Sequence, residues 1–390
     1  MKKGWQTKKL GEVCAFDKTQ GIHHGLPYVG LEHIESNTAR FIGSSEAQPV
    51  KSSTFRFSDE HVLYGRLRPY LNKALAPDFE GHCSTEIFPL KPSPELSREY
   101  LLFWLLADAT CHRINATCTG ARMPRAQMND VLGFEFPVPP LAEQQRIVGL
   151  LDEAFAGLAT AKANAEKNLQ NARALFESHL QSVFTHRGPG WVEKRLGELC
   201  ERITKGSSPK WQGISYVDAP GILFVTSENV GEYDILLEQP KYVEEKFNAK
   251  DKKSILKNGD VLTNIVGASI GRTAVFDRDD VANINQAVCL IRCEPHLLNN
   301  YYLAYLLNSP VFKQVLHDNE VNNARANLSL GFFSQLPVPM PPIPKQKEIV
   351  AKLDAFREET QRLARLYERK HAALEALKKS LLHQAFTGAL

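Results

Sequence analysis

Two stretches of the sequence follow the same pattern: Pro137–Val148 is PVPPLAEQQRIV, and Pro337–Val350 is PVPMPPIPKQKEIV. In this alignment the first prolines of the two stretches match, and the second copy has two extra residues in its proline run. Beyond the prolines the copies keep one register, with Leu151 matching Leu353. An internal repeat of this kind indicates that the chain contains two copies of one module.

Each copy predicts a long helix, because proline stops a helix before this point and none follows until Pro189 in the first copy or at all after Pro344 in the second. Apolar residues recur at alternating spacings of three and four over more than four heptads, which favours a coiled coil. The predicted seam consists of Ile147, Leu151, Leu158, Leu175, Ile349, Leu353, Phe356, Leu363, Leu374, Leu377 and Leu381.

A helix of about 45 residues is roughly 65 Å long, which exceeds a small domain, so we expect the two helices to pair with each other. Asn168 and Lys370 fall at the same seam position, where a polar residue can fix the register of a coiled coil. The alternative is two unrelated amphipathic helices, each buried in its own domain. It leaves the shared register unexplained.

Composition places the chain among globular proteins. Its 390 residues allow two or three domains, with 43% hydrophobic and 23% charged residues. We expect no membrane span and no signal peptide, because no apolar run is long enough. The seven cysteines are scattered without a C-x-x-C pair, which favours reduced thiols and the cytoplasm over zinc or disulfides. Because the net charge is only +3, any basic surface that binds nucleic acid must be a local cluster of Lys and Arg.

The repeat extends into the segments before each helix. Trp5 and Trp191 each begin a W-x4-L-G-E pattern, and Arg125–Met128 (RAQM) matches Arg325–Leu328 (RANL). Short β-rich runs with a few helices predict an α+β fold class with mixed globular domains. The predicted boundaries are a first globular domain at 1–140, a helix at 141–187, a second globular domain at 188–342 and a helix at 343–390.

These motifs resemble the specificity subunit of type I restriction-modification systems, over essentially the whole chain. The residues that carry the resemblance are the two W-x4-L-G-E patterns and the two P-[LI]-x-x-Q-x-x-I-V helix starts. The resemblance implies two target recognition domains separated by two long antiparallel helices, with an internal two-fold pseudo-repeat. Each domain would bind one half of a bipartite sequence in double-stranded DNA.

The resemblance also implies partners and cofactors. The helices would set the spacer and dock two modification subunits, which bind S-adenosylmethionine and methylate adenine in DNA. Restriction subunits would add an ATP- and Mg-dependent translocase and endonuclease. This chain would bind no cofactor itself and would supply specificity without catalysis.

The sequence contains no motif for chemistry of its own: it lacks a phosphate-binding loop and the N-P-P-[FY] pattern of adenine methyltransferases. Asp234 with Glu244, Glu245 and Lys246 forms only a loose nuclease pattern, of a kind common on solvated helices. His23 and His24 have no third ligand nearby, so we expect a polar loop and no metal site.

Candidate DNA contacts are the basic and amide side chains of predicted loops, because arginine binds guanine or phosphate and amides suit adenine edges. For each of them, surface solvation or turn chemistry is the competing explanation. The candidates are Arg66, Arg68, Lys73, Arg122 and Arg125 in the first domain, and Asn264, Asn285, Gln286, Asn322, Asn323, Arg325 and Asn327 in the second.

Two other functions stay open at this point. One is a DNA-recognition fragment that carries an unrecognised nuclease or methyltransferase centre, which DNA modification by the pure chain would favour. The other is a coiled-coil scaffold that does not bind DNA. The sequence indicates neither the DNA target nor the spacer length, because base choice depends on side-chain geometry in the groove.

Overall fold

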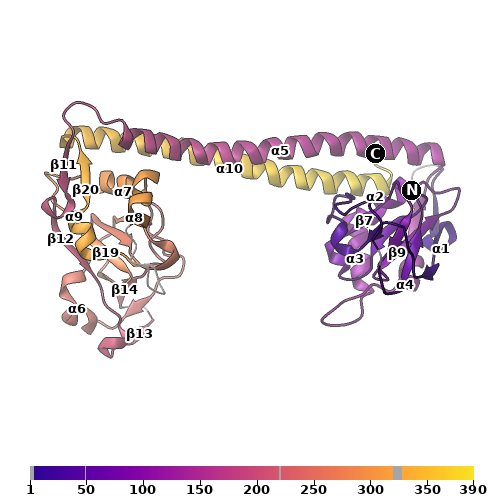
Figure 1. Cartoon of the computed structure of the whole chain (residues 1–390), viewed down its shortest axis with the longest axis horizontal. Helices are drawn as coiled ribbons and strands as arrows, with labels where there is room; N and C mark the ends of the chain where they lie inside the picture. The colour runs from indigo at the N-terminus through magenta and orange to yellow at the C-terminus, as the bar shows by residue number, and fades with distance from the viewer. Residues whose placement is uncertain (1–3, 49, 219–220, 319–326) are drawn as a thin grey trace. The chain divides into compact units, whose positions relative to one another are not determined.

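The computed structural model describes residues 4–48, 50–218, 221–318 and 327–390. The chain divides into two compact units, Met1–Glu166 with Glu368–Leu390, and Lys167–Tyr367. Each unit holds one globular domain, called here the first and the second domain, and part of each of two long helices. These helices are α5 (Leu141–Thr185) and α10 (Ile343–Thr387), and each has 45 residues. They are the longest ribbons in Figure 1.

The first domain contains two four-stranded sheets and one strand pair. One sheet has the order β2 (Cys14–Phe16), β9 (Ile87–Pro92), β6 (Val62–Gly65), β7 (Ala74–Leu75). The other has the order β3 (Gln20–Gly21), β5 (Thr54–Phe57), β8 (Gly81–Cys83), β4 (Tyr28–Val29). The pair is β1 (Gln6–Lys9) with β10 (Glu135–Val138), and the helices are α1 (Leu10–Val13), α2 (Arg98–Leu106), α3 (Asp108–Ala116) and α4 (Met128–Leu132).

The second domain repeats the first of these sheets strand for strand, as β12 (Cys200–Lys205), β19 (Val288–Cys293), β16 (Asp260–Asn264), β17 (Thr273–Phe276). Its other sheet has the order β13 (Tyr216–Val217), β15 (Tyr242–Val243), β14 (Ile222–Val225), β18 (Ala282–Ile284). The strand pair is β11 (Val192–Arg195) with β20 (Pro337–Met340), and the helices are α6 (Lys246–Lys250), α7 (Asn300–Asn308), α8 (Pro310–Asp318) and α9 (Leu330–Gln335).

The strand pairs correct the register of the repeat. Gln6 lies opposite Val138 in the first domain, and Val192, the residue after the matching tryptophan, lies opposite Met340. Val138 is therefore equivalent to Met340, and the alignment that placed two extra residues in the second proline run is wrong. Of the two additional prolines, Pro337 lies in β20 and Pro344 lies in the first turn of α10, so neither is an insertion.

The sheet that both domains share, β2-β9-β6-β7 in the first and β12-β19-β16-β17 in the second, forms one side of each hydrophobic core and is called here the common sheet. All four residues of β6 and all five of β16 are buried. The apolar faces of α2 and α7 cover this sheet, and each helix begins at a side chain that accepts a backbone N–H: Ser97 from Tyr100 and Asn299 from Tyr302. The predicted α+β fold class with paired long helices is confirmed.

A buried glutamine joins each long helix to its globular domain. The Gln144 amide accepts from the N–H of Ser97 (2.7 Å) and donates to the carbonyls of Glu95 and Pro139 (2.9 and 2.8 Å). Gln346 makes the equivalent bonds to Asn299, Leu297 and Pro341 at 2.8, 3.1 and 2.9 Å. Both side chains are fully buried, so the glutamine of the repeated P-[LI]-x-x-Q motif has a structural role: it anchors the start of each long helix to its globular domain.

The two long helices pair antiparallel within each unit. In the first unit Lys162 of α5 pairs with Glu375 of α10 at 2.7 Å, and Phe155, earlier on α5, lies against Lys378, later on α10. In the second unit the ring centroids of Phe176 and Phe356 are 6.3 Å apart. The alternative of two helices buried in separate domains is thereby excluded.

The seam between the helices follows the period of a straight helix, and two seam assignments are wrong. Leu175 and Leu377 are 51% and 46% exposed. Both come four heptads after the first seam residue, and a straight α-helix drifts by about 20° per heptad from the 3.5-residue repeat. Besides Gln144 and Gln346, the buried positions are Ile147, Leu151, Ala165, Ala172, Leu180 and Phe184 on α5, and Ile349, Val350, Leu353, Thr360, Leu382 and Ala385 on α10.

The other predicted seam residues, Leu158, Phe356, Leu363, Leu374 and Leu381, are half-buried. At the matched polar position Asn168 is half-buried and Lys370 is exposed. Within the described part of the chain, no helix combines the length and the apolar character that crossing a membrane requires.

Candidate nucleic-acid interface

The first domain joins two loops that are far apart in the sequence. The segment after β6 meets the segment before α4 through backbone bonds: Arg68 donates to Pro124 (2.8 Å), and Ala126 donates to Arg66 (2.9 Å). Leu67 and Arg125 form a β-bridge at the centre. This loop junction brings the two groups of predicted arginines together on one surface.

Three of the five predicted cations of the first domain make side-chain contacts within the domain. Arg125 is held by Glu86 through paired bonds of 2.8–3.0 Å, which raise the pKa of the guanidinium. Arg66 lies over the Phe88 ring at 5.2 Å, and Lys73 donates to the carbonyl of Leu31 at 2.7 Å.

The remaining two cations, Arg68 and Arg122, are exposed, and no side-chain partner is found for either of them among the described residues. An exposed, unpaired guanidinium keeps all five of its donors available to phosphate or base edges. These two are therefore the strongest candidate DNA contacts of the first domain.

The second domain builds the same junction from different residues. Ile265 accepts from Leu328 at 2.9 Å, and Val266 forms a β-bridge with Asn327. This bridge corresponds to that of Leu67 with Arg125, so Asn327 is the structural equivalent of Arg125, and the sequence match of Arg125 with Arg325 is off by two residues.

The predicted amides of the second domain have different environments. Asn264 is fully buried, and its amide donates to the carbonyls of Ser227 and Val230 and to the Ser269 hydroxyl, so its assignment as a DNA contact is wrong. It holds a neighbouring loop in place. The Asn285 side chain accepts from the N–H of Ala287, whereas Gln286 and Asn327 are exposed. The candidates Asn322, Asn323 and Arg325 lie outside the described residues.

Sequence analysis missed an exposed tryptophan in the second domain. Trp211 is 84% exposed on a turn whose start, Gly206, runs against the backbone of Ile284 and Asn285. The turn is anchored, because Ser207 donates to the Asp251 carboxylate and Lys250 donates to the carbonyl of Gln212. The sequence signal for it is the turn-forming composition of residues 206–211, GSSPKW.

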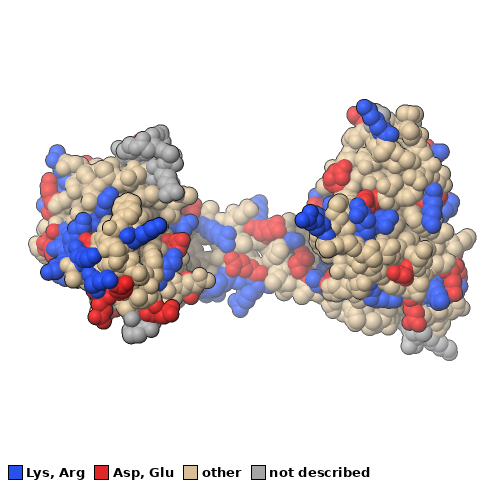
Figure 2. Space-filling view, turned by 90° about the horizontal axis from the view of Figure 1, so that it is seen from below, with Lys and Arg blue, Asp and Glu red and all other residues tan. Residues whose placement is uncertain are grey.

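Cations gather near this turn. Lys205, Lys210, Lys246, Lys250, Lys252 and Lys253 are all exposed. Figure 2 views the second domain from the side on which α6 lies in Figure 1, and a group of Lys and Arg side chains covers part of that face. A local basic surface next to an exposed aromatic ring can bind phosphates and stack on a base.

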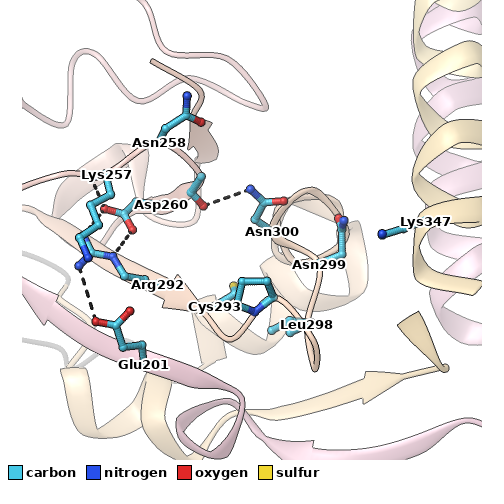
Figure 3. Close-up of a pocket in the computed structure, with 12 residues that line it drawn as sticks. Glu201, Lys257, Asn258, Asp260, Arg292, Cys293, Leu298, Asn299, Asn300 and Lys347 are labelled. Atoms are coloured by element: carbon cyan, nitrogen blue, oxygen red, sulfur yellow. Dashed lines mark hydrogen bonds and ion pairs between the residues drawn. The ribbon is translucent and has the colours of Figure 1, made fainter. Parts of the chain in front are cut away.

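A pocket of about 400 Å³ lies at the other end of β16 and does not include any predicted DNA contact (Figure 3). At its wall Arg292 makes two 2.7 Å bonds to the buried Asp260 carboxylate, which raise the pKa of the guanidinium. The pair joins β19 to β16. We assign this ion pair a structural role in the sheet, because each charge neutralises the other.

The loose nuclease pattern has no geometric support. Asp234 pairs with Arg357 of α10, whereas Glu244 pairs with Lys246. His23 packs on His82, with ring centroids 5.6 Å apart. No group of three or more His, Cys, Asp or Glu able to hold a metal ion occurs in residues 4–48, 50–218, 221–318 and 327–390.

Comparisons with known proteins agree with this architecture. The chain is 25% identical over 300 residues to the Type I restriction enzyme EcoBI specificity subunit of Escherichia coli, covering 71% of this chain and 63% of the relative. It is 20% identical over 409 residues to the MjaVIII specificity subunit of Methanocaldococcus jannaschii, covering 98% and 92%. A match to the Escherichia coli EcoDI specificity subunit spans only 34% of that relative.

Two solved structures share the fold. One, from work on assembly and conformational transition of the type I R-M system, has a TM-score of 0.84 at 24% identity and covers 100% of this chain and 99% of that one. The HsdS subunit of Thermoanaerobacter tengcongensis has a TM-score of 0.69 at 23% identity, covering 100% and 98%.

A family model described as the Type I restriction modification DNA specificity domain matches residues 2–169 and again residues 189–368. The two matches correspond to the two copies of the repeat. This chain therefore belongs to the type I restriction-modification DNA specificity family and carries its domain twice.

Proposed function

We propose that this chain is the DNA sequence-specificity subunit of a type I restriction-modification complex. Each globular domain binds one half of a bipartite DNA target, and the paired helices set the spacer between the halves. The helices also dock two modification subunits. Adenine methylation with S-adenosylmethionine, and ATP- and Mg-dependent cleavage by restriction subunits, take place in those partners in the cytoplasm.

The observation that carries the proposal is the loop junction that occurs twice on the same sheet. The backbone bonds are the same in both domains, from Ala126 to Arg66 and from Leu328 to Ile265. The exposed side chains differ: Arg68 and Arg122 in one domain, Gln286 and Asn327 in the other. One frame that presents two sets of base-binding groups is what two different half-sites require.

The test is to sequence the methylated sites of cells that carry this chain with its modification subunits. A bipartite motif with a fixed spacer is expected. Arg122→Ala should relax one half of that motif, and Gln286→Ala the other half. Arg56→Ala serves as the control, because Arg56 is exposed on β5 and pairs with Glu80 away from the junction. A motif without two separable halves would contradict the proposal.

The pure chain is expected neither to methylate nor to cleave DNA. Methyl transfer from S-adenosylmethionine by the chain alone would favour a recognition fragment with its own catalytic centre. Failure to bind DNA even with modification subunits, measured by mobility shift, would favour a scaffold.

A further inference from the structure

The second domain meets the long helices over one apolar core, and the tip of a hairpin lies at the edge of that core. Near the helix ends the contact is a continuous apolar core, in which Leu180 of α5 and Leu353 of α10 pack with Tyr302 of α7. The edge of the core toward the middle of the helices is formed by the tip of a hairpin, residues 229–236, called here the brace hairpin. Its Tyr233 packs against the same core together with Phe176 of α5. The tip thus widens the contact between the domain and the helix pair, and a wider contact restrains the angle of the domain.

The brace hairpin is a defined structure. Val230 and Ile235 form a β-bridge, and Leu236 donates to the carbonyl of Asn229 at 2.8 Å. Its tip is tied to the common sheet, because the N–H of Tyr233 donates to the carbonyl of Thr273 at 2.8 Å. The tip is thus held from the domain side before it reaches the helices.

Tyr233 has a φ of 73°, in the left-handed region that disfavours residues other than glycine. Its ring makes contacts with three helices. The centroid lies 5.9 Å from Phe176 of α5, 5.1 Å from Tyr305 of α7 and 4.8 Å from the guanidinium of Arg357 of α10. The next residue, Asp234, forms an ion pair with the same arginine. The strained backbone therefore delivers two adjacent side chains to one spot on the helix pair.

Two hollows border the tip. One of about 530 Å³ lies between the helices and the domain and is lined by Tyr233, Phe176 and Arg357. The other, of about 230 Å³, is lined by Tyr233, Tyr305 and Asp354. The tip is therefore bordered partly by the core and partly by these hollows, and its removal would enlarge the unpacked space between the domain and this part of the helices.

The first domain has the same hairpin at the equivalent place, with a bridge between Ile34 and Phe41. Its tip also carries positive φ angles, 63° at Asn37 and 60° at Ala39. Lys378 of α10 donates to the carbonyl of Asn37 at 2.7 Å and lies 5.3 Å from the ring of Phe155.

These helix residues occupy matching positions of the repeat. Phe155 matches Arg357, and Phe176 matches Lys378. In both units the aromatic ring is on α5 and the cation is on α10. Tyr233 contacts both Phe176 and Arg357, whereas in the first unit Lys378 contacts both the hairpin and Phe155. The hairpin sequences, ESNTAR and GEYD between the bridged residues, show no similarity, so the shared placement indicates a shared task.

We propose that the brace hairpin and its counterpart in the first domain, residues 34–41, are positioning elements that fix the angle of each domain against the helix pair, and that they thereby set which DNA spacer length is accepted. The proposal rests on the proposed function. Tyr233, Asp234, Arg357 and Lys378 would act through domain orientation, without touching DNA.

The experiment compares Tyr233→Gly, Arg357→Gln and Lys378→Ala in the complex with modification subunits. Glycine accepts the φ of Tyr233 at no cost, so this variant removes the ring without straining the fold. The substrates are the methylated target of the unaltered complex and the same target with its spacer one base pair longer or shorter. Arg362→Gln is the control, because Arg362 lies on α10 and pairs with Glu359 of the same helix.

We expect each brace variant to reduce the preference for the native spacer at least fivefold while both half-site sequences stay unchanged, and the control to keep the full preference. An undiminished preference in the brace variants would overturn the proposal. If the unaltered complex methylates no bipartite target, the proposed function fails instead.

A second measurement needs no DNA. Spin labels are placed at Lys252→Cys in the second domain and Glu358→Cys on α10, with Cys118, Cys200 and Cys293 replaced by serine. Double electron–electron resonance on the full chain should show a broader distance distribution in Tyr233→Gly. An unchanged distribution would overturn the brace, and a broader one with unchanged spacer preference would overturn its role in spacing.

Discussion

The two globular domains share one sheet and differ in the other. The order β2-β9-β6-β7 recurs as β12-β19-β16-β17. In the second sheet both domains keep a parallel pair, β4 with β8 and β14 with β18. The next strand joins opposite members of that pair: β5 lies beside β8, whereas β15 lies beside β14.

The shared sheet is therefore the constant frame of each domain, and the second sheet is the part that varies between them. The shared sheet carries the loop junction, the brace hairpin and the contacts to the long helices, so its geometry is constrained from several sides. The edge of the second sheet has fewer such constraints and accepts a strand on either side. A protein built this way can change a recognition surface without changing how the domain is mounted.

The largest effect is expected where the shared sheet itself uses different polar groups. Asp260 and Arg292 form a buried pair, whereas the equivalent residues in the first domain are His61, bound to Asp17, and the exposed Lys91. Arg292→Met should destabilise the second unit by about 3–5 kcal/mol, because it leaves a buried carboxylate unpaired. Urea denaturation measures the loss.

The matched change Lys91→Met should have little effect, since that charge is exposed and pairs only with Glu60. The double variant Asp260→Leu/Arg292→Met should recover much of the stability, because no charge is left uncompensated. A small cost for Arg292→Met alone would mean that the two sheets are held by the same forces after all.

The next prediction tests whether the two domains are anchored to their long helices in the same way. Gln144→Ala and Gln346→Ala each leave one N–H and two carbonyls without their partner, which should cost about 2–4 kcal/mol in either unit. The two losses should be equal within about 1 kcal/mol, since the three bonds are equivalent. Hydrogen exchange, followed separately in the two units, distinguishes equal from unequal losses.

A smaller effect addresses the part that differs. Alanine at Arg68 or Arg122 should weaken binding to one half-site by about 1–3 kcal/mol per base contact, which is about 5- to 150-fold. Gln286→Ala and Asn327→Ala should affect the other half-site only. A phosphate contact would appear as a uniform loss with a shallower salt dependence. Equal loss at both half-sites would break the assignment of one domain to one half.

The smallest effect is expected on the helices. Leu175→Ala and Leu377→Ala remove exposed side chains and should change the stability of the isolated chain by less than about 0.5 kcal/mol. Leu151→Ala and Leu353→Ala, at buried positions, should cost about 2–5 kcal/mol. A large loss of stability in Leu175→Ala, measured by thermal unfolding, would instead support the heptad seam predicted from the sequence.

The sequence alone determined the repeat, the two long helices and the α+β class. These depend on local signals: proline before each helix, apolar spacing along it and short alternating runs in between. It also selected the segments that form the first loop junction, because basic residues cluster there. Arg66, Arg68, Arg122 and Arg125 do lie together.

Tertiary structure decided the rest. The register of the proline runs depends on the strand pairing with residues 130 positions or more away, which placed Asn327 where Arg325 was expected. Asn264 is polar, but the fold buries it, and its amide donates to the carbonyls of Ser227 and Val230 and to the hydroxyl of Ser269. The brace at Tyr233 depends on where three helices converge, and Leu175 is exposed because a straight helix drifts off the heptad, an angle that no single residue encodes.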